Sequence, residues 1–434
     1  MSEAKIREIE RADVVVVGGG LAGLTAAAKA AGEGRRVVVL DSHRIGGRAT
    51  VDHRNGFRFN RGPRALYVDG PGRRVLESLG VATDRGGNPA TRGAMGLRRG
   101  RLGLLPQGPG TLLRTDLLPA SEKAASARAF ARLPRLHPGD FVGMTADEAI
   151  RSLRLGPSGI ELVRAVVRVA TYTAATDVLD GPAAIRQVQL ASGAGVLYLD
   201  GGWQSLVDAL VDRATSDGAV VRSGVAVREI TDEDGMPLVV TAVGDRIRAQ
   251  QVVVAAGGPD AAASLLGSPH VPWTETGPPA TAACLELGLR HLPTTRVIFG
   301  VDEPLYLSTH CPPADLAPPG SAVVHVMRYT RHDEDLPADE VRNRLEELAR
   351  TAGIREDDVV ESRFLSRMVV TGAIPTAAAG GLAGRPAVDV PGRQGVLLAG
   401  DWVGDEGLIG DAALASGARA GRLAAERSGT LAVA

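Results

Sequence analysis

The chain has 434 residues, of which 44% are hydrophobic and 23% charged, and its formal net charge is −1. This length and composition predict a globular protein of two domains, and the near-neutral charge argues against a nucleic-acid partner. Two cysteines, a charged N-terminus and the lack of an apolar run of about 18 residues argue against a disulfide framework, a secretory signal and a membrane-spanning helix, so we expect a cytoplasmic protein.

Residues 13–41 carry the strongest local signal. The continuous apolar run over 14–17 predicts a buried parallel strand, because such strands are covered on both faces. A helix of small residues is predicted over 24–31, and a second apolar strand over 37–40 ends at Asp41. Together they form a strand–helix–strand unit that is typical of a nucleotide-binding α/β fold.

A G-x-G-x-x-G turn joins the first strand to the helix and contains Gly18, Gly20 and Gly23. Gly18 permits the sharp turn, Gly20 lets a pyrophosphate approach the backbone, and Gly23 lets the helix pack against the sheet. The helix N-terminus offers free N–H groups to phosphates, and Asp41 is placed to accept hydrogen bonds from an adenosine ribose. The pattern predicts a dinucleotide site; the alternative is a glycine-rich turn without a ligand.

The segment after Asp41 contains a glycine pair between Arg44 and Arg48. Arg48 is suited to neutralising a phosphate. The alternative is a solvated basic turn, but the position directly after Asp41 favours the phosphate.

Three motifs in this part of the chain resemble a known family. GGGLAGL over 18–24, RIGGR over 44–48 and GFRFNRGPRALY over 56–67 resemble the FAD-dependent oxidoreductases of the phytoene desaturase, protoporphyrinogen oxidase and amine oxidase superfamily, above all its phytoene-dehydrogenase-like members. The resemblance implies that the dinucleotide is FAD and that Gly62 and Pro63 lie beside the isoalloxazine ring. The family usually has Glu at the position of Asp41. Asp is also a carboxylate, so the contact with the ribose stays plausible.

Residues 76–195 predict a mainly helical cap, because Gly and Pro turns interrupt helical segments and no alternating strand pattern persists. Thr145 and Glu148 form a capping box, and a helix is predicted over 160–170. The run over 102–133 mixes leucines, prolines and arginines, which fits a membrane surface or the cover of an apolar substrate tunnel. An ordinary cap helix and loop is the favoured interpretation.

The chain then returns to the first domain. The sequence YLDGGW over 198–203, followed by a helix, again resembles the family. A strand is predicted over 220–230, and the resemblance implies that the backbone of Val227 binds the adenine. A hairpin across 244–245 and a buried strand over 251–256 follow.

A second excursion over 270–385 predicts a sheet with one helix, which carries the substrate pocket. The helix is amphipathic and covers 336–353. Strands are predicted over 285–289, 297–299, 306–307 and 323–327.

No histidine or cysteine spacing in this region predicts a metal site. Cys284 and Cys311 are expected to be buried small hydrophobic residues. His325 could reach the pocket, although a structural histidine is the favoured interpretation.

The last part of the chain gives a second strong signal. A buried strand over 395–399 leads to Gly400 and Asp401, and a long helix of small residues follows over 408–425. The resemblance implies that Asp401 binds the ribityl chain and that the helix N-terminus, at Ile409 and Gly410, faces the flavin pyrimidine, where its dipole stabilises negative charge. We expect a loop at 380–384, and therefore no second nucleotide site.

The predicted fold class is α/β, with a discontinuous Rossmann-type FAD-binding domain and a substrate domain of mixed sheet and helices. The FAD domain is expected to comprise 10–75, 196–265 and 386–430, and the substrate domain 76–195 and 266–385. The predicted cofactor-binding residues are Gly18, Gly20, Leu21, Ala22, Gly23, Asp41, Ser42, Gly47, Arg48, Gly62, Pro63, Val227, Gly400, Asp401, Ile409 and Gly410.

The resemblance implies that a small-molecule substrate delivers a hydride to flavin N5. Amine oxidases of the superfamily carry a lysine near N5 in the middle of the chain, but no lysine follows Lys123 here, and an aromatic amine cage is also missing. These absences favour a dehydrogenase or desaturase that acts on an apolar or specialised metabolite, with oxygen, a quinone or another carrier as electron acceptor. Pocket candidates are Arg64, Tyr67, Tyr172 and Arg328.

Two alternatives stay open. One is a flavin amine or amino-acid oxidase. The other is a non-catalytic binding protein similar to GDP-dissociation inhibitors, which would be expected to lose RIGGR and the Gly400–Asp401 pair, both present here. The substrate, the oligomeric state and a peripheral membrane contact do not follow from the sequence.

Overall fold

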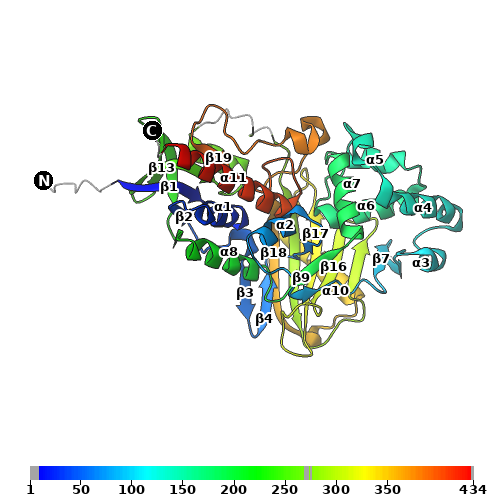
Figure 1. The fold of residues 1–434 in the computed structure, drawn as a ribbon. Helices are drawn as coiled ribbons and strands as arrows, with labels where there is room; N and C mark the ends of the chain where they lie inside the picture. Colours follow the sequence, from blue (N-terminus) through cyan, green and yellow to red (C-terminus); the bar gives the residue numbers. More distant parts are fainter. Residues whose placement is uncertain (1–8, 268–272, 274–275, 432–434) are drawn as a thin grey trace.

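The computed structural model describes residues 9–267, 273 and 276–431 and contains two large β-sheets with helices packed on them. Figure 1 shows the first sheet at the end of the molecule where both chain termini lie, and the second sheet with the cap helices at the other end. The predicted α/β fold class is confirmed.

The first sheet has seven strands and a parallel centre. Its order is β10 (Val220–Ser223), β2 (Val37–Asp41), β1 (Glu10–Val17), β13 (Arg246–Val254), β12 (Met236–Thr241) and β11 (Val227–Glu233), with β19 (Val396–Leu398) also paired to β13. The four valines that end β1 are at most 4% exposed. Because both faces of this strand are covered, its successive positions are all apolar. β13 changes partner on one side along its length, because its first three residues pair antiparallel with β12 and its last three pair parallel with β19.

The helix α1 (Leu21–Gly32) packs against both α8 (Gln204–Ser216) and α11 (Ile409–Leu431). Figure 1 shows α11 alongside α1, although the two come from opposite ends of the chain. The approach is close: a Cβ on Gly417 would lie 2.3 Å from the carbonyl oxygen of Ala22. The small residues of α11 are therefore required by its contact with α1.

The second sheet also has seven strands. Its order is β18 (Val359–Thr371), β14 (Ala280–Leu289), β17 (Ala322–Thr330), β16 (Leu305–Cys311), β15 (Val297–Gly300), β7 (Met95–Arg98) and β8 (Arg101–Leu104). The predicted amphipathic helix is α10 (Ala338–Thr351), which covers one face with its buried Val341, Leu345 and Leu348. The cap helices α6 (Pro157–Thr171) and α7 (Gly181–Ser192) pack on the other face.

The cap also contains α3 (Pro109–Arg114), α4 (Ala120–Arg132) and α5 (Ala146–Ser152). The capping box of α5 is confirmed, since Thr145 N–H donates to Glu148 Oε2 (2.8 Å) and Glu148 N–H donates to Thr145 Oγ1 (3.2 Å). Within the described residues, none of the helices combines the length and apolarity that a bilayer crossing requires. The smaller elements are β3 (Val51–Arg54), β4 (Phe57–Asn60), β5 (Leu66–Tyr67), α2 (Pro71–Ser78), β6 (Gly86–Gly87), β9 (Val196–Leu199) and α9 (Pro259–Leu266).

Two predictions about strands are wrong. The strand expected over 220–230 is divided into β10 and β11, which lie at opposite edges of the first sheet, and Gly224 turns the chain between them at a φ of +72°. The cap was expected to be mainly helical without a persistent strand pattern, yet its β7–β8 hairpin extends the second sheet. The sequence pattern of this hairpin is weak because Gly96 pairs with Gly103, and glycine has a low strand propensity. Leu117 fills the space where side chains at these two positions would lie.

Candidate active site

A groove of about 1390 Å³ runs along the carboxyl ends of the parallel strands of the first sheet. This is where open α/β sheets bind their ligands. One part of its wall comes from the start of α1 and the end of β2, and another comes from the turn after β19 and the start of α11. The groove therefore joins the two sequence motifs that lie about 400 residues apart.

The glycines at the start of α1 have separate roles in this wall. Gly20 is the N-cap of α1, has no side-chain cap, and has nothing within 4 Å of the position of a Cβ. Gly18 has a φ of +108°, and a Cβ there would lie 2.5 Å from the carbonyl oxygen of Ala255. At Gly23 a Cβ would lie 1.9 Å from the Gly18 carbonyl oxygen. The result is an open cradle with free helix N–H groups, which fits a pyrophosphate.

Asp41 lies at the end of β2 and lines the groove. Its Oδ2 accepts the N–H of Gly19 (2.7 Å), and its Oδ1 accepts the N–H of His43 (2.8 Å). These bonds fix the orientation of the carboxylate and leave lone pairs for a ligand hydroxyl, because a carboxylate offers about four acceptor sites.

Arg48 and Asp401 form an ion pair of 2.7 Å between Nη1 and Oδ2 in the wall of the groove. The carboxylate is buried and also accepts the N–H of Gly372 (3.0 Å), while the arginine is 40% exposed and donates to the carbonyl of Val370 (3.1 Å). Arg48 and Asp401 were expected to contact different parts of the cofactor, and their contact with each other was not predicted. Their pairing places both at one point of the groove.

The start of α11 forms another part of the wall through Ile409 and Gly410. The ring of Trp203 packs so closely here that a Cβ on Gly410 would lie 2.5 Å from it. The next residue, Asp411, is buried and accepts the N–H of Gly72 (3.1 Å). Burial raises the pKa of Asp411 to about 7, and the Gly72 hydrogen bond offsets this only in part.

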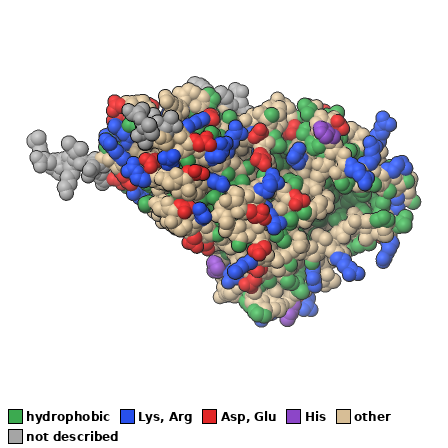
Figure 2. Space-filling view, in the orientation of Figure 1, with side chains coloured by type: hydrophobic (Ala, Val, Ile, Leu, Met, Phe, Trp, Pro, Cys, Tyr) green, Lys and Arg blue, Asp and Glu red, His purple; other side chains and the backbone are tan. Residues whose placement is uncertain are grey.

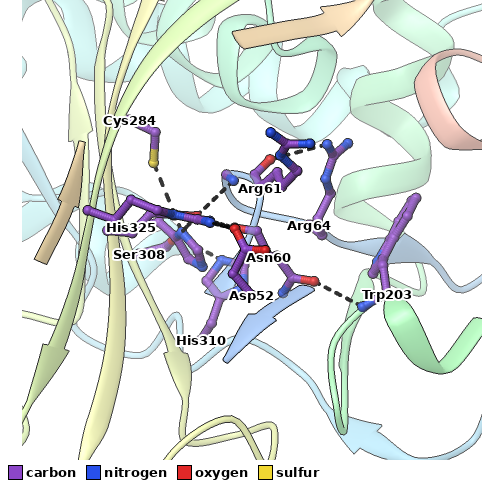
Figure 3. A network of polar contacts seen from close by, with 12 residues as sticks. Asp52, Asn60, Arg61, Arg64, Trp203, Cys284, Ser308, His310 and His325 are labelled. Atoms are coloured by element: carbon purple, nitrogen blue, oxygen red, sulfur yellow. Dashed lines mark hydrogen bonds and ion pairs between the residues drawn. The ribbon is translucent and has the colours of Figure 1, made fainter. Parts of the chain in front are cut away.

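A buried polar network connects the groove to the second sheet (Figure 3). Glu286 on β14 is fully buried and accepts the N–H of Gly62 (2.8 Å). Arg363 on β18 is 8% exposed and pairs with both Glu286 and Asp52. It also donates to the carbonyl of Asn60 (3.1 Å). The network holds the loop that carries Arg61, Gly62, Pro63 and Arg64 between the two sheets.

Cys284, Glu286 and His325 place their potential ligand atoms within 4.8 Å of one another. The strand register brings them together, because Glu286 lies opposite His325 on β17. We assign no metal to them, because the oxygens of Glu286 already bind Arg363 and the N–H of Gly62. His325 also contacts Glu286 (Nδ1 to Oε1, 3.3 Å), so this histidine is part of the network.

Both cysteines are free and buried, as predicted. Burial raises the pKa of the Cys284 thiol and of the Cys311 thiol.

Of the four pocket candidates, only Arg64 lines the groove. Its guanidinium lies 5.6 Å from the centre of the Trp203 ring. Burial and the neighbouring charge of Arg48 lower the pKa of Arg64 to about 10. Tyr67 donates instead to the carbonyl of Ala170 (2.7 Å).

The remaining two candidates face other partners. Tyr172 meets the ring of Tyr329 edge-on at 6.3 Å, and Arg328 pairs with Glu334 (2.6 Å). Neither they nor Tyr67 line the groove.

The predicted cofactor residues line the groove with three exceptions. Gly23 is covered by the turn after the first strand, and Gly62 and Pro63 do not line the groove although their sequence neighbours Arg61 and Arg64 do. The sequence predicted no site role for Glu286 or Arg363, and Trp203 stood out only as the last residue of the YLDGGW motif. Glu286 gave a usable signal, since it is a single acid between Leu285 and Leu287 in an apolar strand. A buried acid of this kind requires a buried partner.

Comparison with known proteins indicates a flavin, the cofactor that the motifs of the sequence also imply. The family described as flavin containing amine oxidoreductase matches residues 21–425. Coproporphyrinogen III oxidase of Propionibacterium freudenreichii is 35% identical over 108 residues, which are 24% of this chain and 20% of that protein. Phytoene dehydrogenase of Streptomyces griseus is 27% identical over 337 residues, which are 66% of this chain and 59% of that protein. The matches thus span less than two thirds of these relatives.

The fold is shared with solved structures. The crystal structure described as a putative protoporphyrinogen oxidase from Exiguobacterium superposes with a TM-score of 0.69 and 18% identity, covering 97% of this chain and all of the other.

Proposed function

This chain belongs to the flavin containing amine oxidoreductase family and is a FAD-dependent oxidoreductase, and we propose that it dehydrogenates an apolar organic substrate at a carbon–carbon or related bond. The observation that carries this proposal is the absence of lysine from the groove: the basic residues that line it are Arg44, Arg48, Arg61, Arg64, Arg228 and the imidazole of His43. The last lysine of the sequence is Lys123. The match to a phytoene dehydrogenase supports an apolar substrate.

The residues of the groove fit FAD, because the open glycine cradle, the oriented Asp41 and the start of α11 all line it. When bound, FAD supplies the acceptor for a hydride. We propose that the N-terminus of α1 binds the pyrophosphate and that Asp41 binds the adenosine ribose. Arg48 and Asp401 would bind the cofactor between these points and Ile409–Gly410, where the N-terminus of α11 favours negative charge.

The protein's contribution at the reacting end is the placement of the substrate and the exclusion of water. Arg61, Arg64 and Trp203 line the groove, and we propose that they form its reacting end. The network of Glu286 and Arg363 holds the loop rigidly. We propose that the residues of the second sheet and cap bind the substrate. We also propose that the protein is cytoplasmic, that its electron acceptor is oxygen, a quinone or another carrier, and that it contacts a membrane peripherally.

The first experiment is an absorbance spectrum of the purified protein, followed by anaerobic mixing with polyenes, isoprenoids, porphyrinogens and amines. Flavin bands that bleach with an apolar carbon substrate support the proposal. Bleaching with amines alone would overturn it in favour of an amine oxidase. A protein that stays colourless after addition of FAD would instead be a binding protein of the same fold.

A further inference from the structure

The outer end of the cap is strongly basic. The segment 92–135, which forms β7, β8, α3 and α4, contains nine lysines and arginines but only two acidic residues, a net charge of +7. The whole chain has a net charge of −1, so the remainder carries −8. Figure 2 shows Lys and Arg side chains projecting around the end of the molecule that these elements form. We refer to segment 92–135 as the basic cap end.

Apart from Arg98, which pairs with Glu161 (2.8 Å), the arginines of the basic cap end are exposed and make no ion pair with another described residue. They include Arg99, Arg101, Arg114, Arg128, Arg132 and Arg135. Exposed arginines elsewhere are often neutralised, as in the pairs of Arg342 with Glu346 and Arg422 with Glu426.

The two acids of the basic cap end do not offset this charge. Asp116 is a single exposed carboxylate. Glu122 is bound to the N-terminus of α6, because its carboxylate accepts from Ser158 Oγ (3.3 Å) and from the N–H of Gly159 (3.0 Å).

The same end exposes apolar surface. Leu113 on α3 is 73% exposed and stands next to Arg114. Lys123 Nζ donates to the carbonyl of Leu113 (2.7 Å), which holds α3 against α4. Figure 2 shows a hollow lined by hydrophobic side chains over α4, α6 and β7, with Lys and Arg side chains around it. Apolar surface surrounded by basic groups is typical of a membrane-facing site.

We propose that the basic cap end docks on the surface of an anionic lipid bilayer, with Leu113 inserted at the level of the headgroups. Each basic residue near such a surface raises the partition coefficient about fivefold. An acidic protein would match the charge but not the protruding Leu113 and the apolar hollow. The docking specifies the membrane contact included in the proposed function but does not depend on the proposed dehydrogenation. The admission of substrate from the bilayer through the hollow does depend on it.

The test is co-sedimentation of the full-length, FAD-loaded protein with vesicles of phosphatidylcholine alone or mixed with phosphatidylglycerol. We expect binding to the mixed vesicles only, weakened by salt because exposed charges are screened. The double variant Arg114→Glu and Arg128→Glu should lower the partition coefficient at least about 25-fold, since two charges are lost and reversed. Leu113→Ser should remove the binding that persists in high salt.

The matched control is Arg290→Glu with Arg350→Glu, the same charge change on the second sheet and α10, where both residues are exposed. Equal loss of binding in control and test variants would overturn the proposal, as would no binding to anionic vesicles. Binding to soluble polyglutamate but not to vesicles would identify an acidic protein as the partner and also overturn it. Flavin reduction by detergent-dispersed substrate tests the proposed function separately, because it requires no vesicle.

Discussion

Replacing Arg363 with methionine should destabilise the protein strongly, because it leaves Glu286 charged and buried. Glu286 is fully buried and Arg363 is 8% exposed, so water cannot replace the lost partner. Removing one member of a buried ion pair costs about 3–5 kcal/mol in the free energy of unfolding. Asp52, the other carboxylate partner, has a side chain that is 42% exposed and can be hydrated, so we assign most of the cost to Glu286.

The double variant Glu286→Gln with Arg363→Met should recover much of this loss. Glutamine keeps an acceptor for the N–H of Gly62, and no uncompensated buried charge remains. The remaining cost is the hydrogen bond to the carbonyl of Asn60, about 1–2 kcal/mol. We therefore expect the double variant to be about 2–3 kcal/mol more stable than Arg363→Met alone.

The measurement is urea unfolding of the FAD-free protein, which separates stability from cofactor binding, with the transition followed by circular dichroism and tryptophan fluorescence. Phe57→Leu provides a control for a modest change in the same region. A double variant that is no more stable than Arg363→Met would show that the charge pair is not what holds the two sheets together. A loss below about 1 kcal/mol for Arg363→Met would refute the buried geometry itself.

Three further predictions concern the groove and the helix α11. Asp41→Ala should weaken FAD binding by about 1.5–3 kcal/mol, measured by titration, because it removes charge-assisted hydrogen bonds; unchanged affinity would contradict the placement of Asp41. Asp411→Asn should stabilise the protein at pH 8 but not at pH 4. The folded-state pKa of Asp411, about 7, lies above the ordinary value of 3.8 for an aspartate, so the contribution of Asp411 to stability is present below pH 3.8 and is lost as the pH rises through 7, by at most about 4 kcal/mol. A thermal-melt difference that does not depend on pH would refute this. Gly421→Ala should lower stability by about 1–3 kcal/mol in the same melts, because its Cβ would lie 2.4 Å from the carbonyl oxygen of Ala26, whereas Gly110→Ala has open space and serves as control.

The parts of the fold that follow from short stretches of sequence could be predicted. β1, α1 and β2 were identified because their apolar runs, glycines and terminal Asp41 lie within about 30 residues. α10 was identified from its apolar stripe, and α5 from its capping box. In each case the physical cause is local, so the sequence contains it.

Features that depend on distant partners could not be predicted. β10 and β11 read as one strand because both begin with valine and only a short segment separates them in the chain. Only their pairing with β2 and β12 separates them in space. β18 was missed since much of its surface is exposed and charged. The network of Glu286 and Arg363 joins residues 77 positions apart, and its register is set by the pairing of β14 with β18.

The candidate site depends on a contact that no motif describes, the close packing of α1 against α11. The N-termini of both helices line the groove, so the distance between them determines whether one extended ligand can reach both. That distance is set by Gly417 and Gly421, where any side chain would collide with the backbone of α1. A larger residue at either position would displace the start of α11 without changing a groove residue. The glycines of α11 thus belong to the cofactor site as much as those of the G-x-G-x-x-G turn, although they touch no part of the groove.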